Sequence, residues 1–309
     1  MDKKNALKVE DLTKIYSGKT SNEIKALNNL NLEVKEGEIF GLLGPNGAGK
    51  TTFLNILAGT VIKNSGSVNV WGYDLDLNSR QVRSSIGIVP QEINLDAFFS
   101  PRNLLELQAG LYGIPKKDRI TDTILKLVSL EKQADSYARS LSGGMKRRLL
   151  IGKAMVHRPP ILVLDEPTAG VDVQLRQNLW NNVKTLNKQG VTIILTTHVI
   201  YEAQEMCDRI AILNKGNLVT LDTTDNLLES ITTKKIIFKV KKINTINPKN
   251  LNGIKFSYNS KNEIIASYER KKHKIDEVIS RVKNSGMEIY DISTEEGNLE
   301  DVFVDVTKN

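Results

Sequence analysis

Short apolar runs separated by turn residues predict an α/β fold for the first two thirds of this chain. Residues 39–43 are apolar and precede a glycine-rich turn, and a helical pattern follows at residues 53–58. Residues 161–164 form a second apolar run between a Pro-Pro pair and two carboxylates, which is typical of a strand buried on both faces of a parallel sheet. Residues 191–195 form the next strand-like run. The pattern predicts a strand–turn–helix unit and further parallel strands.

The last quarter of the chain has a different pattern, typical of a small α+β domain. Residues 236–240, 264–268 and 287–292 read as strands. Between the second and the third of them, apolar residues at helical spacing predict a helix that ends near Gly286; they are Ile275, Val278, Ile279 and Val282. Residues 299–306 predict a final helix. We therefore expect one domain over residues 1–230 and an accessory domain over 231–309.

The turn after residues 39–43 carries a phosphate-loop motif, G-x-x-x-x-G-K-[ST], without substitution. It reads Gly44-Pro45-Asn46-Gly47-Ala48-Gly49-Lys50-Thr51 and is followed by Thr52. Glycines let backbone N–H groups surround a phosphate, and the following helix start adds its positive dipole end. We expect Lys50 to reach the terminal phosphates and the Thr51 hydroxyl to hold Mg²⁺. The motif predicts a nucleoside triphosphate site.

Three polar residues follow the two later strands. Asp165 and Glu166 come at the carboxyl end of the 161–164 run, where open α/β sheets bind ligands. Asp165 would support Mg²⁺, and Glu166 could orient or deprotonate a water that attacks the γ-phosphate. His198 follows the 191–195 run and could contact the γ-phosphate, although a lone histidine is more often a surface or core residue.

A second glycine-containing segment, residues 141–148, reads Leu-Ser-Gly-Gly-Met-Lys-Arg-Arg. Ser142 is a good N-cap for a helix over the apolar residues that follow. Three cations crowd the start of that helix, where the macrodipole disfavours positive charge, so the segment is interpreted as an anion receptor. The alternative is a glycine hinge with cations facing solvent. Met145 lies 20 residues before Asp165 (165 − 145).

Composition and charge narrow the class of protein. Of 309 residues, 40% are hydrophobic and 26% charged, as in ordinary globular proteins, and no apolar run approaches the length of a membrane span. A single cysteine, Cys207, and the absence of an apolar signal core favour a cytoplasmic location. Residues 231–283 hold 14 Lys/Arg against 4 Asp/Glu within a net charge of +7. This basic stretch is interpreted as a solvated face, with nucleic acid or an anionic membrane as the alternative partner.

Taken in order, these motifs resemble those of ABC transporter ATPase subunits, over about residues 7–225. The resemblance implies a P-loop NTPase of the ABC type: a mixed sheet core, an inserted helical subdomain at about residues 92–155, and the accessory domain. It implies ATP and Mg²⁺ as cofactors. The resemblance also assigns roles along the chain: Tyr16 stacks on adenine, Gln91 contacts Mg²⁺ or the attacking water, Ser142, Gly143 and Gly144 bind the γ-phosphate held by a second subunit, Glu166 is the catalytic carboxylate, and Asp172 lies in the subunit–subunit loop.

The same resemblance implies partners. One copy of each motif requires a second ATPase subunit, most simply another copy of this chain. A separately encoded membrane permease would hold the pair at the inner face of the membrane, with a short permease helix in a groove beside the glutamine loop. Phe98 and Phe99 are candidates for that groove, or else pack inside the helical subdomain. No membrane insertion and no nucleic-acid binding are expected.

The branch of the family is indicated by Met145, where the commonest signature has glutamine. Residues 141–148, followed by Ala-Gly-Val-Asp at 169–172, resemble exporter ATPases of the type-two permease group, which includes multidrug and daunorubicin-type exporters. The ending Asn298-Leu299-Glu300-Asp301-Val302-Phe303 also resembles the C-terminus of that group. An importer subunit, or a soluble ABC protein that acts on ribosomes or DNA, are the alternatives.

Overall fold

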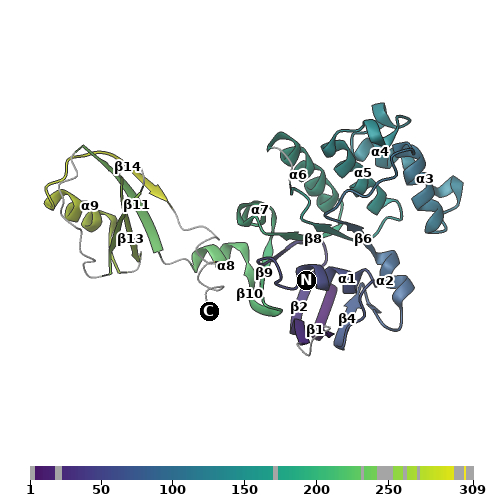
Figure 1. The fold of residues 1–309 in the computed structure, drawn as a ribbon, viewed down its shortest axis with the longest axis horizontal. Helices are drawn as coiled ribbons and strands as arrows, with labels where there is room; N and C mark the ends of the chain where they lie inside the picture. The colour runs from purple at the N-terminus through teal and green to yellow at the C-terminus, as the bar shows by residue number, and fades with distance from the viewer. Residues whose placement is uncertain are drawn as a thin grey trace. The chain divides into compact units, whose positions relative to one another are not determined.

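The structure, a computed structural model, describes residues 4–17, 23–169, 173–230, 233–241, 253–259, 263–269, 272–295 and 303 (Figure 1). The chain folds into two compact units, Met1–Thr223 and Thr224–Asn309. Each unit has its own hydrophobic core. The division predicted at residues 230 and 231 stays a prediction.

The first unit contains a four-stranded antiparallel sheet with the order β2-β1-β4-β5. Its strands are β1 (Asn5–Ser17), β2 (Glu23–Lys35), β4 (Ser65–Val70) and β5 (Tyr73–Asp74). One face of this sheet is apolar and enters the core, for example through Leu7 on β1 and Leu30 on β2. The sequence patterns above did not predict this sheet.

A six-stranded sheet with the order β10-β9-β3-β8-β7-β6 is the centre of the first unit. Its strands are β3 (Ile39–Leu43), β6 (Ile86–Val89), β7 (Ile161–Asp165), β8 (Thr192–Thr197), β9 (Arg209–Asn214) and β10 (Asn217–Thr223). The pairs β3–β8, β3–β9, β7–β8 and β6–β7 are parallel, and β10 is antiparallel to its neighbour β9. All of β3 and the first four residues of β7 are buried, which confirms the predicted strands.

Parallel pairing brings three strand ends to one edge of this sheet. Leu43 at the end of β3 lies opposite Thr197 of β8, and Asp165 at the end of β7 lies opposite Thr196. The phosphate loop, the two carboxylates and His198 therefore start from the same edge. This is the edge at which parallel α/β sheets bind ligands.

Helices connect these strands, and three of the α-helices lie in the segment between β6 and β7. In the first unit they are α1 (Lys50–Leu57), α2 (Ser79–Ser85), α3 (Pro101–Leu111), α4 (Thr121–Leu127), α5 (Gly143–Met155), α6 (Val173–Lys188) and α7 (Ile200–Met206), with 3-10 turns at Lys116–Asp118, Glu131–Gln133 and Ala138–Ser140. Helices α3, α4 and α5 pack on one another (Figure 1). The predicted helices at residues 53–58 and after Ser142 are confirmed by α1 and α5.

The second unit contains α8 (Thr224–Glu229) and an antiparallel sheet with the order β12-β13-β11-β14. Its strands are β11 (Thr233–Val240), β12 (Lys255–Tyr258), β13 (Ile264–Glu269) and β14 (Ile289–Glu295), and α9 (Ile275–Asn284) buries Val278 and Val282 in their core. The three predicted strands and the predicted helix are confirmed. The helix predicted at 299–306 lies outside the described residues, apart from Phe303.

Candidate active site

The phosphate loop joins β3 to α1 through backbone positions that only glycine fits. Gly49 is the N-cap of α1 with φ of 109°, and a Cβ there would lie 2.5 Å from the Ala26 carbonyl oxygen. A Cβ on Gly44 would lie 2.6 Å from the Leu213 carbonyl oxygen. The loop is therefore shaped by close approach to β2 and β9 as well as by its own turn.

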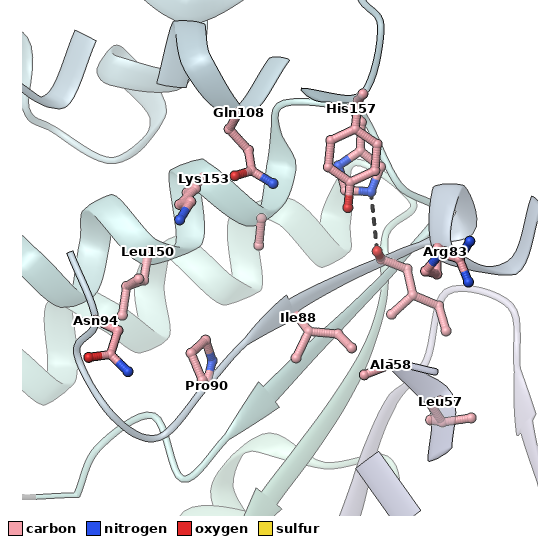
Figure 2. Close-up of a pocket in the computed structure, with 13 residues that line it drawn as sticks. Leu57, Ala58, Arg83, Ile88, Pro90, Asn94, Gln108, Leu150, Lys153 and His157 are labelled. Atoms are coloured by element: carbon pink, nitrogen blue, oxygen red, sulfur yellow. Dashed lines mark hydrogen bonds between the residues drawn. The ribbon is translucent and has the colours of Figure 1, made fainter. Parts of the chain in front are cut away.

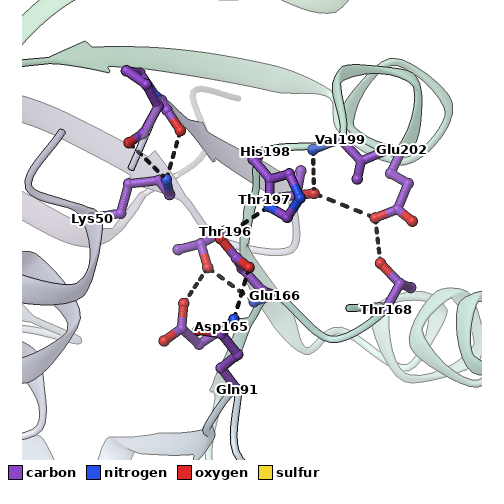
Figure 3. A network of polar contacts seen from close by, with 12 residues as sticks. Lys50, Gln91, Asp165, Glu166, Thr168, Thr196, Thr197, His198, Val199 and Glu202 are labelled. Carbon is purple, nitrogen blue, oxygen red and sulfur yellow. Dashed lines mark hydrogen bonds and ion pairs between the residues drawn. The ribbon is translucent and has the colours of Figure 1, made fainter. Parts of the chain in front are cut away.

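Lys50 is the first residue of α1 and is buried. Its ammonium donates to the carbonyl oxygens of Gly44, at 2.6 Å, and Pro45, at 3.3 Å. Burial lowers the pKa of Lys50, and the carboxylates of Glu166 and Asp165 partly oppose that shift. The cation thus lies between the loop and the two carboxylates, where it can meet an anionic ligand (Figure 3).

Asp165 and Glu166 leave the end of β7 in different environments. Asp165 Oδ1 accepts a hydrogen bond of 2.5 Å from the Thr196 hydroxyl. Burial raises the pKa of Asp165, and the charge of Glu166 adds to the shift, while the Thr196 hydrogen bond and Lys50 oppose it. Glu166 has φ of 44°, in the left-handed region, and its N–H donates to the carbonyl and hydroxyl oxygens of Thr196.

The carboxylate of Glu166 joins two other predicted site residues (Figure 3). Gln91 Nε2 donates to Oε2 at 3.0 Å, and His198 Nδ1 lies 3.1 Å from Oε1. Glu166 comes from the end of β7, Gln91 follows β6, and His198 follows β8. The fold thus brings together three side chains that lie far apart in the sequence, at the carboxyl edge of the sheet.

These residues open into a cleft of about 750 Å³. Its walls come from β2, the phosphate loop, the loops after β6, β7 and β8, and the β9–β10 turn, and its lining residues are Ile24, Lys25, Ala26, Asn46, Gly47, Ala48, Gly49, Lys50, Thr51, Thr52, Gln91, Glu166, Ala169, His198 and Lys215. The volume suits a nucleotide. Ile24, Lys25 and Lys215 were not predicted, because nothing local in the sequence connects them to the loop.

Tyr16 is not among the residues that line this cleft. It is 39% exposed near the end of β1, opposite Ile24 in the strand register, and the Lys14 ammonium lies 4.9 Å from its ring centre. Ile24 does line the cleft. Stacking of adenine on Tyr16 stays a prediction.

The Ser142 segment starts α5 as predicted but lies outside the cleft lining. Ser142 caps the helix by accepting a hydrogen bond from the Met145 N–H, at 3.3 Å. Gly143 is exposed, and a Cβ there would meet no atom within 4 Å. One chain therefore does not bring Ser142, Gly143 or Gly144 to its own phosphate loop.

Two of the three cations after this helix start do not form the predicted anion receptor. The guanidinium of Arg147 is directed to the carbonyl oxygens of Pro90, Gln91 and Ala169. That of Arg148 donates to the carbonyl oxygens of Val128 and Ser129. Both cations thus bind carbonyl groups of their own chain, so the interpretation of all three as an anion site was wrong.

Other predicted positions have mixed outcomes. Asp172 lies outside the described residues. Phe98 and Phe99 are 72% and 40% exposed, so internal packing is wrong for Phe98, and neither lines a described groove. Thr51, Gln91 and Asp165 offer the oxygen donors that Mg²⁺ prefers, and the single carboxylate of this set fits an ion that is bound through one or two carboxylates beside nucleotide phosphates. No group of three His, Cys, Asp or Glu side chains among the described residues could hold a metal by itself.

A separate groove of about 350 Å³ lies beside the segment that carries Gln91 (Figure 2). It is lined from α1, α2, β6, α3 and α5 by Leu57, Ala58, Arg83, Ile86, Ile88, Pro90, Asn94, Gln108, Tyr112, Leu150, Lys153, Ala154 and His157. The rings of Tyr112 and His157 stack at 3.8 Å, and a hydrogen bond joins His157 to the Ile86 carbonyl oxygen.

No helix in the described part of the chain is long and apolar enough to cross a membrane.

Comparisons with known proteins agree with this geometry. The sequence profile described as ABC transporter matches residues 27–169. The linearmycin resistance ATP-binding protein LnrL of Bacillus subtilis is 38% identical over 224 residues, which cover 72% of this chain and 70% of that protein. This chain belongs to the ABC transporter family. The Nod factor export ATP-binding protein I of Burkholderia thailandensis is 40% identical to this ABC subunit over 206 residues, covering 66% of the chain and 68% of that protein.

Solved ABC cassettes have the same fold. An ATP-binding subunit of an ABC transporter matches 73% of this chain and 92% of its own length, with a TM-score of 0.63 and 28% identity. A cassette solved as a dimer in a post-hydrolysis state with ADP and Pi matches 71% of this chain and 98% of its own, with a TM-score of 0.62 and 29% identity. This chain is an ABC ATPase and groups with the exporter type, so the importer, ribosomal and nucleic-acid alternatives are not favoured.

Proposed function

We propose that this ABC ATPase powers export through a separately encoded permease, as one of two identical nucleotide-binding subunits. The observation that supports a dimer is that the phosphate loop and the Ser142–Gly144 helix start lie apart within one chain. The phosphate loop and Glu166 line the cleft, whereas the Ser142–Gly144 helix start lies outside it. A second copy would bring its own helix start to the cleft, and ATP would then lie between the two subunits.

The roles of the site residues follow from their positions. Lys50 would bind the terminal phosphates, and Thr51 and Asp165, with Gln91, would hold Mg²⁺, which supplies charge neutralisation at the phosphates when bound. Glu166 would orient and deprotonate the attacking water. Its carboxylate is held between Gln91 and His198, so it starts from a defined position. His198, with a half-exposed ring, is free to turn toward a γ-phosphate.

The groove beside Pro90 is the proposed docking place of a permease helix. Its lining combines apolar side chains with the cations Arg83 and Lys153, and it adjoins the segment whose next residue, Gln91, lines the nucleotide cleft. Movement of that segment could carry the state of the nucleotide to the membrane subunit. Docking there would hold the chain at the inner face of the membrane.

The dimer is tested with Glu166→Gln, which retains the shape of the side chain but removes the base. We expect the purified variant to bind ATP, to lose nearly all turnover, and to pass from monomer to dimer on addition of Mg-ATP in size-exclusion chromatography with light scattering. Normal hydrolysis would remove Glu166 from its role. A monomer under both conditions would contradict ATP-driven dimerisation of the isolated subunit.

A further inference from the structure

Among the described residues, the buried cation Arg147 donates its hydrogen bonds only to backbone carbonyl groups. It lies in the second turn of α5 and is 4% exposed. One terminal nitrogen, Nη1, donates to the Gln91 carbonyl oxygen at 2.6 Å and to that of Pro90 at 3.2 Å, and Nη2 reaches the Ala169 carbonyl oxygen at 3.5 Å. Within the described part of the chain, Arg147 pairs with no carboxylate, and its Nε has no acceptor. Placing a charge there without a counterion is costly, and burial accordingly lowers its pKa.

Two of the three carbonyl groups belong to residues that line the nucleotide cleft, Gln91 and Ala169. Gln91 donates its side-chain amide to Glu166, and Ala169 lies three residues after Glu166 and lines the same cleft. Pro90 lines the neighbouring groove. Arg147 itself follows the Ser142–Gly144 helix start by one turn. One side chain therefore connects the Gln91 segment, the Glu166 turn and the helix start.

The guanidinium group is suited to this arrangement, and the ammonium group of lysine is not. Its planar fork carries separate donors on separate nitrogens, which allows Nη1 and Nη2 to bind different segments at once. A lysine would retain the charge but gather its donors at one point. Substitution by lysine therefore tests whether the site needs two separate donors, as a positioning role requires, or only a buried cation.

We propose that Arg147 is a positioning residue for ATP hydrolysis: it holds the Gln91 backbone and the turn after Glu166 in register with the start of α5. The Gln91 amide thereby stays within reach of the Glu166 carboxylate. Any further transmission to the groove beside Pro90 rests on the proposed docking of the permease there. The positioning itself concerns the ATPase reaction and needs no permease.

Arg148 is a matched control on the same helix. Its guanidinium also donates to two backbone carbonyl oxygens, Val128 at 2.8 Å and Ser129 at 3.0 Å, which lie at the end of α4. Burial lowers its pKa as well. Arg148 differs from Arg147 in where its carbonyl partners lie, because neither Val128 nor Ser129 lines the nucleotide cleft.

The test compares Arg147→Lys and Arg148→Lys in the full chain. For Arg147→Lys we expect kcat for ATP to fall between about 10- and 100-fold, as for other residues that orient a functional group, while the Kd for Mg-ATP stays within about twofold. Arg148→Lys should retain kcat and Kd. Equal effects of the two substitutions, or a loss for Arg147→Lys confined to Kd or to thermal stability, would overturn the proposal.

A double-mutant cycle with Gln91→Ala separates positioning from general destabilisation. If Arg147 acts through Gln91, adding Arg147→Lys to Gln91→Ala should lower kcat much less than it does in the wild-type chain. If the two substitutions lower kcat by independent factors that multiply in the double variant, the proposal is overturned. Failure of both Arg147→Lys and Arg147→Gln to fold, while the Arg148 variants fold, would also overturn it by making Arg147 a folding residue. Neither outcome depends on whether Glu166→Gln dimerises, so the two proposals can fail separately.

Discussion

Thr196→Val removes one buried hydroxyl that serves both carboxylate residues of the active site. Thr196 is fully buried on β8, and its Oγ1 donates to Asp165 Oδ1 at 2.5 Å and accepts from the Glu166 N–H at 3.1 Å. Valine has nearly the same shape, so packing changes little. The Glu166 N–H retains the Thr196 carbonyl oxygen, at 3.1 Å, as acceptor. The main loss is therefore the hydrogen bond to the ionised carboxylate.

Hydrogen bonds to charged groups contribute about 1.5–3 kcal/mol, so Thr196→Val should lower the free energy of unfolding by about that amount at pH 8. The hydrogen bond lowers the pKa of Asp165, so its removal raises that pKa further. The bond favours the ionised form, so the difference in unfolding free energy between variant and wild type should shrink as the pH falls through the raised native-state pKa of Asp165, where this carboxyl becomes protonated. The acid limb of the ATPase pH profile should move to higher pH.

Urea unfolding followed by tryptophan fluorescence measures this effect, because both tryptophans, Trp71 and Trp180, lie in the first unit. Thr192→Val is the control: Thr192 is equally buried on β8, but its hydroxyl accepts from the Gly37 N–H, a neutral group. It should cost about 0.5–1.5 kcal/mol at every pH and leave the ATPase profile unchanged. A loss for Thr196→Val that is independent of pH, or no larger than that of the control, would refute the reasoning.

Two further substitutions test other parts of the account. Burial raises the pKa of Asp165, so the native state binds this proton more tightly than the unfolded state does. The ionised carboxylate therefore lowers the stability of the protein once the pH is above the ordinary pKa of the group. Asp165→Asn should raise the urea midpoint at pH 8, with the gain disappearing near pH 4, while ATPase activity is lost. An unchanged midpoint at pH 8 would contradict this. Phe98→Ala with Phe99→Ala should change unfolding free energy by no more than about 0.5 kcal/mol per site, because both rings are exposed, and unfolding of the isolated subunit by the pair would end their assignment to an interface.

The parts of the site that sequence predicted are those with local patterns. The buried strand before Gly44, the carboxylates after residues 161–164 and the N-cap at Ser142 each depend on neighbours in sequence, and all are confirmed in the structure. Parallel pairing then brings Asp165 opposite Thr196. The shared edge of the sheet follows from strand order, which sequence pattern alone does not give.

The parts that sequence missed depend on tertiary packing. Lys215 enters the cleft from the β9–β10 turn, and Ile24 and Lys25 from β2, although all three lie far from the phosphate loop in sequence. Arg147 was taken for an anion-binding cation because its charge was visible and its carbonyl partners, 56 and 57 positions earlier, were not. Side-chain charge is a local property, whereas the partner of that charge is set by packing.

A mixing experiment tests the composite site most directly, in a Glu166→Gln background. One variant adds Lys50→Ala and loses phosphate binding, while the other adds Gly143→Glu, which introduces an anion at an exposed position where a Cβ meets no atom within 4 Å. Each alone has two defective sites and should stay monomeric with Mg-ATP. Their mixture has one intact site and should form a heterodimer, measured by light scattering. A mixture that stays monomeric, or a Gly143→Glu variant that dimerises alone, would contradict a site shared between two subunits.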